Sequence, residues 1–205
     1  EIIEKDGFNI DQSLSFAIEG DTPATMAKTT GLGIIQISSA LEILKPEVVI
    51  TVADRYETMA TAIAAAYQNI VLAHIQGGAV TGSIAGSVRH AITKLSHVHF
   101  PCTEASKNNI IKMGENEKFV FNVGCPSIDE LKSEMSPELD LTKLSGVGYK
   151  ISSNAKFNLV IFHPVTTSLE SNEYQTKELL KAVEQIGKAT IWLWPNIDAG
   201  TDSIS

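Results

Sequence analysis

The sequence predicts an α/β protein with parallel, doubly wound sheets. Short runs of β-branched residues alternate along the chain with longer segments whose apolar residues recur at helical spacing. This alternation is typical of strand–helix–strand units, in which each helix returns the chain to the start of the next parallel strand. A glycine-rich turn also follows one of the short runs and opens a helix, and α/β proteins bind their ligands at that edge of the sheet.

The first part of the chain contains the clearest elements. Thr22 and Pro23 predict a helix start, because threonine is a favourable N-cap and proline fits the first helical position, and Pro46 ends that helix. The β-branched run 48–52 predicts a strand buried on both faces. The further expected elements are a helix over 56–67, a strand over 70–75, a helix over 84–96 with an inner stripe of Ile84, Val88, Ala91, Ile92 and Leu95, a strand over 98–100, a helix over 104–113 and a strand over 119–123.

The alternation is interrupted between residues 132 and 156, where serine, glutamate, lysine and glycine predominate. It resumes with a strand over 159–162, a helix over 171–186 and a strand over 190–194. We therefore expect three regions: an N-terminal Rossmann-like domain over 1–132, a linker region over 133–157 and the start of a second Rossmann-like domain over 158–205. The chain begins without methionine and stops as a helix starts, which indicates an internal fragment.

Composition narrows the class of protein. A net charge of −8 argues against a nucleic acid as the main partner, because phosphate backbones are bound by clustered lysine and arginine. The apolar runs are too short to cross a membrane, and no secretory signal opens the chain, so we expect a cytoplasmic protein. Cys102 and Cys125 show no CxxC spacing, which favours buried free thiols over a disulfide framework or a metal site.

Four polar segments fall where predicted strands end, at residues 54–55, 76–83, 163–167 and 195–200. Turns after strands are normally polar, so each segment alone is a weak signal. Together they lie at the carboxyl ends of the predicted strands in two α/β units. Polar loops on facing edges form a cleft, which is the usual place for a ligand.

Asp54 and Arg89 are the charged candidates in the first unit. Asp54 follows a strand and can act as a base or hold a cation, or it can cap the helix that begins at residue 56. Arg89 can bind a phosphate or a carboxylate through two hydrogen bonds, or it can be a solvated helix residue. One helical turn before Arg89, where a carboxylate would pair with it, the chain has Ala85.

The histidines divide into three groups. His163 follows a strand and precedes proline, which suits either phosphate binding or a structural hydrogen bond to a carbonyl. His74 lies within an apolar strand and is expected to be structural. The three remaining histidines, His90, His97 and His99, do not form a convincing metal site.

The glycine-rich turn carries Gly77, Gly78 and Gly82, which can let backbone amides approach a ligand. Their spacing matches neither the GxGxxG fingerprint nor a P-loop. Neither dinucleotide nor triphosphate binding follows from it, and we expect no cofactor and no metal.

Several segments together closely resemble the UDP-N-acetylglucosamine 2-epimerase family, and in particular its hydrolysing branch in sialic-acid and nonulosonate synthesis. The matching segments occur in family order: Asp54–Glu57, His74–Gly78, Thr81–Ser83, Arg89–His97, Gly124–Ser127, His163–Thr167 and Trp194–Gly200. The resemblance implies a GT-B-like pair of Rossmann-type parallel-sheet domains with a UDP-sugar between them. It also implies that both domains are incomplete in this chain, which lacks the first strand and most of the second domain, and that the full-length protein is a homo-oligomer.

The resemblance also implies a reaction. UDP-N-acetylglucosamine would lose its C2 proton and then UDP in an anti elimination, and water would add to the resulting 2-acetamidoglucal to release N-acetylmannosamine. The catalytic positions of the family match Asp54, Arg89 and His163. The substrate-binding positions match Gln76, Gly77, Gly78, Ser83 and Asn196.

The chain departs from the family where acids are usual, at Ala79, Ala85 and Gly86, and Ala53 replaces the usual glycine before the Asp-Arg pair. The position of Ala85 carries a catalytic carboxylate in the family, and losing a general acid–base group costs roughly 10²–10⁴-fold in rate. Two alternatives therefore stand beside the hydrolysing enzyme. One is an impaired homologue that binds nucleotide sugar, and the other is a non-hydrolysing epimerase.

Overall fold

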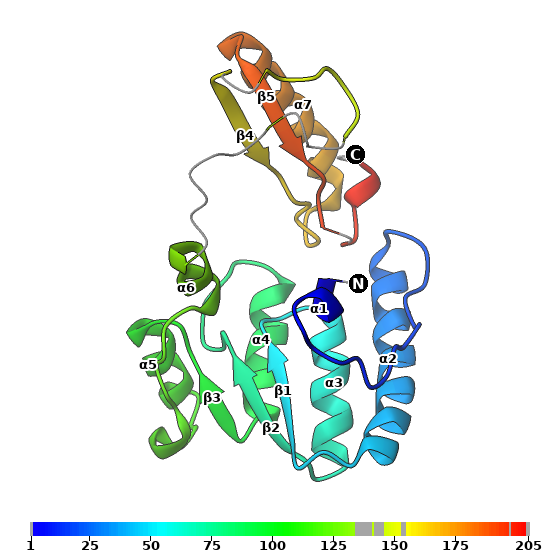
Figure 1. Cartoon of the computed structure of the whole chain (residues 1–205), viewed down its shortest axis with the longest axis vertical. Coiled ribbons are helices and arrows are strands. Elements are labelled where there is room, and N and C mark those ends of the chain that lie inside the picture. The colour runs from blue at the N-terminus through cyan, green and yellow to red at the C-terminus, as the bar shows by residue number, and fades with distance from the viewer. Residues whose placement is uncertain (1, 134–140, 142–145, 153–154, 197, 204–205) are drawn as a thin grey trace. The chain divides into compact units, whose positions relative to one another are not determined.

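The computed structural model describes residues 2–133, 141, 146–152, 155–196 and 198–203 (Figure 1). The chain divides into two compact units, one formed by residues 1–20 and 24–125 and the other by residues 21–23 and 126–205. Each unit contains a parallel sheet, which confirms the predicted α/β class. Much of the predicted linker over 133–157 falls outside the described residues, so the linker stays a prediction.

The sheet of the first unit has three parallel strands in the order β1 (Val48–Val52), β2 (Val71–Ile75) and β3 (Val98–Phe100). The register pairs Val52 with Ile75 and Ile75 with Phe100. The three strands therefore end side by side, and the loops that follow them start from one edge of the sheet.

Helices α3 (Tyr56–Tyr67) and α4 (Ile84–Leu95) connect these strands and pack against the sheet and against each other (Figure 1). Their buried alanines and Ile92 meet Leu72 of β2 in the core. Helix α2 (Pro23–Leu44), which ends before Pro46 as predicted, adds Leu41 to that core.

Helix α5 (Glu104–Lys112) is capped by Thr103, whose hydroxyl accepts a hydrogen bond from the amide of Ser106 at 3.1 Å. A short helix, α1 (Ile2–Lys5), lies near the start of the chain.

Strand β1 is buried on one face rather than on both. Val49 and Thr51 are buried, whereas the alternate residues Val48, Ile50 and Val52 are 50%, 61% and 46% exposed. Successive side chains of a strand point to opposite faces, and the packed helices of the described chain cover the face of Val49 and Thr51. The prediction of a fully buried strand was therefore wrong.

Two further predictions are corrected by the packing. The segment 119–123 is not a regular strand: residues Glu117–Phe119 form a 3-10 turn, η1, and a single bridge joins Val120 to His99. The predicted inner stripe of α4 is confirmed in part: Ile92 is buried, and Val88 and Leu95 pack against the core. Ile84 is instead 48% exposed, and Gly86, Arg89 and Thr93 are buried as well.

The second unit has two parallel strands, β4 (Phe157–Ile161) and β5 (Ala189–Leu193), joined by helix α7 (Leu169–Ile186). These bounds lie within two residues of the predicted ones. Helix α6 (Pro126–Ser133) was not predicted, whereas the 3-10 turn η3 (Thr201–Ser203) lies where the sequence predicted the start of a helix. Among the described residues, no helix has both the length and the apolar character needed to span a membrane.

Candidate active site

The centre of the candidate site is an ion pair between Asp54 and Arg89. Asp54 lies two residues beyond β1, and Arg89 lies in the middle of α4. The guanidinium donates through Nη2 to Oδ2 of Asp54, and the two side chains are only 10% and 17% exposed. Its other terminal nitrogen, Nη1, donates to the carbonyl of Ala79 at 2.8 Å and lies 3.5 Å from the hydroxyl of Thr81. Arg89 thus fixes both the carboxylate and the glycine-rich turn.

This geometry decides between the alternatives left open by the sequence. The N-cap of α3 is Arg55, and Asp54 instead gives its carboxylate to Arg89. Arg89 is 9% exposed and is therefore not a solvated helix residue. The carboxylate that pairs with Arg89 comes from the end of β1 and not from the preceding turn of α4, where Ala85 stands.

His74, in β2, holds the backbone immediately before Asp54. Its Nε2 lies 2.8 Å from the carbonyl of Ala53, and its Nδ1 lies 3.1 Å from the hydroxyl of Thr93. A carbonyl only accepts, so Nε2 carries the proton and donates it to Ala53. Burial lowers the pKa of His74 to about 4, which keeps the ring neutral near pH 7. His74 therefore has the expected structural role: it holds the residue that leads into Asp54.

The glycines of the turn are required by close packing. A Cβ on Gly77 would lie 2.9 Å from Nδ1 of His74, and a Cβ on Gly78 would lie 2.2 Å from the carbonyl oxygen of Ser106. Gly78 also has a φ of +80°, and its own carbonyl accepts a hydrogen bond from Nδ2 of Asn109 at 2.9 Å. Both glycines are buried. Because neither residue has a Cβ, the turn can lie directly against α5 and the His74 ring.

Gln76 and Ser83 lie at the two ends of this turn. Gln76 adopts a left-handed backbone, with a φ of +64°, and its side-chain amide donates to Sγ of Cys125 at 3.8 Å. Ser83 occupies the N-cap of α4, but its hydroxyl makes no capping hydrogen bond to the helix. The assignment of Gln76, Gly77, Gly78 and Ser83 to substrate binding stays a prediction.

The three positions at which the resemblance led us to expect acids, Ala79, Ala85 and Gly86, lie around Arg89. The carbonyl of Ala79 binds the guanidinium, and Ala85 lies one helical turn before it. A Cβ on Gly86 would lie 2.7 Å from the backbone oxygen of Thr81. Any side chain at this position would therefore force the turn to move, so the path of the turn favours glycine at position 86.

The second unit holds the other two predicted residues. His163 lies two residues beyond β4, and Asn196 lies three residues beyond β5. The Nδ1 atom of His163 accepts a hydrogen bond from the backbone amide of Asn196 at 3.1 Å. The ends of the two parallel strands are thus joined by His163, as the shared edge predicted. The structure thus brings Asp54 and Arg89 together in the first unit and His163 and Asn196 together in the second.

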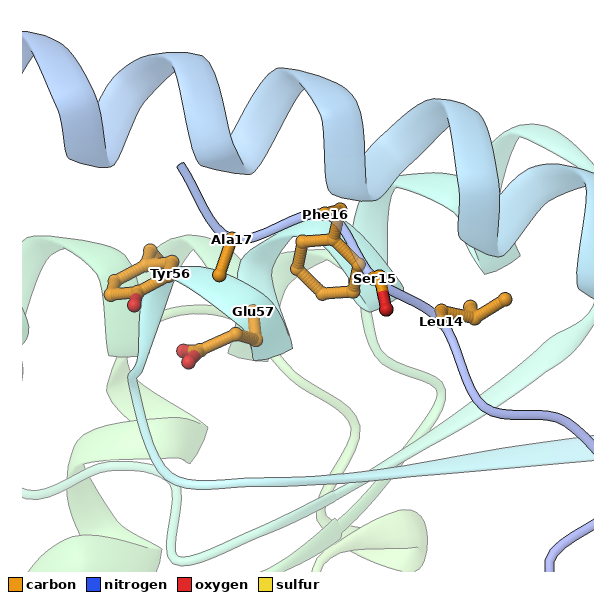
Figure 2. A pocket seen from close by; sticks show the side chains of 6 residues that line it. All are labelled: Leu14, Ser15, Phe16, Ala17, Tyr56 and Glu57. Carbon is orange, nitrogen blue, oxygen red and sulfur yellow. The ribbon is translucent and has the colours of Figure 1, made fainter. Parts of the chain in front are cut away.

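A pocket of about 390 Å³ lies beside the start of α3 and was missed by sequence reasoning. Figure 2 shows its six lining side chains, which come from Leu14–Ala17 and from Tyr56 and Glu57. Glu57 is already held by two hydrogen bonds of 3.1 Å from Arg55, so its carboxylate is partly satisfied. The pocket does not include Asp54 or Arg89, although it begins two residues from Asp54. Residues 14–17 precede the first regular element of the predicted fold and gave no periodic signal.

The described residues contain no group of three or more histidine, cysteine, aspartate or glutamate side chains arranged to hold a metal ion. His97 and His99 instead make contacts within the first unit. His97 accepts a hydrogen bond from the amide of Leu72 at 3.2 Å, and Nε2 of His99 lies 3.4 Å from a carboxylate oxygen of Glu115.

The chain matches the family model described as UDP-N-acetylglucosamine 2-epimerase over residues 1–205. It is 35% identical over 198 residues to a Legionella pneumophila protein named UDP-N,N'-diacetylbacillosamine 2-epimerase (hydrolyzing), covering 97% of this chain and 52% of the relative. It is 33% identical over 180 residues to a Neisseria meningitidis UDP-N-acetylglucosamine 2-epimerase, covering 87% of this chain and 46% of the relative.

A solved structure of Methanocaldococcus jannaschii UDP-GlcNAc 2-epimerase in complex with UDP-GlcNAc and UDP shares the fold, with a TM-score of 0.75 and 18% identity. The match covers 98% of this chain and 55% of that one. The chain thus spans about half the length of the curated relatives and solved structures that it matches.

Proposed function

Because the chain belongs to the UDP-N-acetylglucosamine 2-epimerase family, we propose that the whole protein is a hydrolysing 2-epimerase of a UDP-linked acetamido sugar. The sugar loses its C2 proton to a base and its UDP by anti elimination, and water adds to the glucal to release the free 2-epimer. The observation that carries this proposal is the largely buried pair of Asp54 and Arg89 at the carboxyl edge of the first sheet.

The pair supplies the two kinds of group that this elimination needs. The C2 proton is not adjacent to a carbonyl and is weakly acidic, so its removal requires a fixed base and stabilisation of the leaving diphosphate. We assign the proton transfer to Asp54, whose carboxylate is oriented by Arg89. We assign stabilisation of negative charge to Arg89 and to His163.

The remaining predicted residues are proposed to bind the substrate. Arg89 holds the turn after β2, and this turn carries Gln76, Gly77, Gly78 and Ser83. In the second unit, the backbone amide of Asn196 is hydrogen-bonded to His163. The names of the relatives support two sugars, N-acetylglucosamine and N,N'-diacetylbacillosamine.

The test is to incubate the full-length protein with UDP-N-acetylglucosamine and, separately, with UDP-N,N'-diacetylbacillosamine, and to measure UDP release while NMR identifies the sugar. We expect UDP and a free 2-epimer from one of them. Formation of the UDP-linked 2-epimer would instead identify a non-hydrolysing epimerase, and no release from either sugar nucleotide would refute the proposal.

The Asp54→Asn variant tests the base. It removes the proton acceptor while keeping the side-chain shape, and we expect turnover to fall by roughly 10²–10⁴-fold. Asp11→Asn, which changes an exposed aspartate of the same unit, serves as the matched control and should leave turnover unchanged.

A second candidate function is an impaired homologue that binds the nucleotide sugar without turning it over. The alanines at 79 and 85 and the glycine at 86 favour it, because none of these residues can transfer a proton. Ala85→Asp should then raise turnover, whereas Ser87→Asp, on an exposed position of the same helix, should not. Turnover of the unmodified protein at an ordinary enzymatic rate would eliminate this candidate.

A further inference from the structure

The two cysteines of the chain lie at the same edge of the first sheet as Gln76. Cys102 is two residues beyond β3, and Cys125 ends the segment that runs from Val120 alongside β3. That segment is held to the strand by the Val120–His99 bridge and by a hydrogen bond of 2.8 Å from the amide of Phe121 to the carbonyl of His99. Because β3 and this segment run parallel, the two thiols that follow them lie at the same edge of the sheet.

The two side chains interact there. The thiol of Cys125 accepts the side-chain amide of Gln76 at 3.8 Å, and Cys125 also acts on the neighbouring thiol of Cys102. Neither cysteine is in a disulfide, and both are partly exposed. Both thiols are thus partly exposed, whereas the sequence favoured buried ones. Burial raises the pKa of the Cys102 thiol, and the neighbouring Cys125 raises that pKa further.

We propose that Cys102 and Cys125 form a modification site at which a low-molecular-weight disulfide reversibly oxidises the pair to an intramolecular disulfide. The thiolate of one cysteine attacks the small disulfide, forms a mixed disulfide and releases one small thiolate. The second cysteine then attacks its neighbour's sulfur, which forms the protein disulfide and releases the second small thiolate. The protein loses two protons and two electrons, and both pass to the two small thiols.

Two features of the site favour the intramolecular product. Thiols at the ends of two neighbouring parallel segments can meet by side-chain rotation, whereas remote thiols need backbone movement. The partial exposure of both side chains allows the small disulfide to reach them. The new bond would tie the loop after β3 to the segment that leads into α6, directly beside Gln76. This inference does not depend on the proposed function.

The experiment exposes the reduced full-length protein to oxidised glutathione, blocks the remaining thiols with iodoacetamide and digests the product with trypsin without reduction. Trypsin releases Cys102 in peptide 95–107 and Cys125 in peptide 119–132. We expect the two peptides joined, at two hydrogen masses below their sum, in a protein that stays monomeric on a denaturing gel without reductant. Dithiothreitol should separate them.

Cys125→Ser is the control: the joined peptide should disappear, and Cys102 should carry either glutathione or the alkyl group. A second measurement is thermal unfolding, in which oxidation should raise the melting temperature of the unmodified protein but not that of the variant. Separately alkylated or separately glutathionylated peptides in the unmodified protein, or a link between two chains, would overturn the proposal.

Discussion

Asp54 and Arg89, which are 35 positions apart in the sequence, form a salt bridge that joins the end of β1 to the middle of α4. Both side chains are largely buried, so each charge is compensated by the other rather than by solvent. Removing one partner of a buried pair leaves an uncompensated charge, which destabilises a protein far more than the loss of a surface contact. The pair is therefore both a candidate catalytic element and a structural one.

A double-mutant cycle in stability measures the structural role. Asp54→Asn and Arg89→Met should each lower the free energy of unfolding by roughly 2–4 kcal/mol, because each leaves one charge without its partner. The double variant should lose clearly less than the sum of the two, since neither charge remains. Urea unfolding of the four proteins measures the coupling. Strictly additive losses would show that the ion pair has no structural role.

The parts of the fold that the sequence predicted well are those set by local patterns. Helix α2 begins at Pro23, and α3 begins and ends where the alanine-rich segment predicted, because capping residues and apolar periodicity act over a few positions. Strands β1 and β3 have the predicted bounds for the same reason.

The errors come from contacts between distant segments. The exposed face of β1 depends on which face the helices cover, and the burial of Arg89 depends on a carboxylate that the sheet brings from 35 positions away. The pairing of the Cys102 and Cys125 thiols likewise depends on the Val120–His99 bridge. No periodicity within one segment carries this information.

Acidification should destabilise the first unit through His74. The pKa of His74 is about 4 in the folded protein and near 6.5 in the unfolded chain, so between these values the unfolded state binds the extra proton. Stability is then complete above pH 6.5 and falls as the pH drops towards 4, by up to roughly 3 kcal/mol from this residue. His99, whose pKa burial also lowers, adds a change of the same sign.

Urea unfolding of the unmodified protein and of His74→Gln at several pH values between 4.5 and 7.5 measures this contribution. The variant should be less stable at pH 7.5 but should lose less stability on acidification. Equal pH slopes for the two proteins would assign the acid sensitivity to other groups.

The glycine-rich turn offers a matched pair of substitutions. Gly78→Ala would place a Cβ 2.2 Å from the carbonyl oxygen of Ser106 at a φ of +80°, so α5 or the turn must move. We expect this variant to lose at least about 2 kcal/mol of unfolding free energy. A Cβ on Gly82 meets nothing within 4 Å, so Gly82→Ala should be close to neutral. Similar melting temperatures for both variants would contradict the packing role of Gly78.

Ala53 leads directly into Asp54 with a φ of +62°, a conformation that costs a residue with a Cβ but not glycine. Ala53→Gly should therefore stabilise the protein by up to about 1 kcal/mol, because the relief of strain outweighs the greater freedom of the unfolded chain. The same exchange at Ala182, an exposed position inside α7, should instead cost about 1 kcal/mol, since helical glycine is unfavourable. Opposite shifts in the urea midpoint are expected. A loss of stability in both variants would mean that the hydrogen bond from His74 to the Ala53 carbonyl does not hold a strained residue in place.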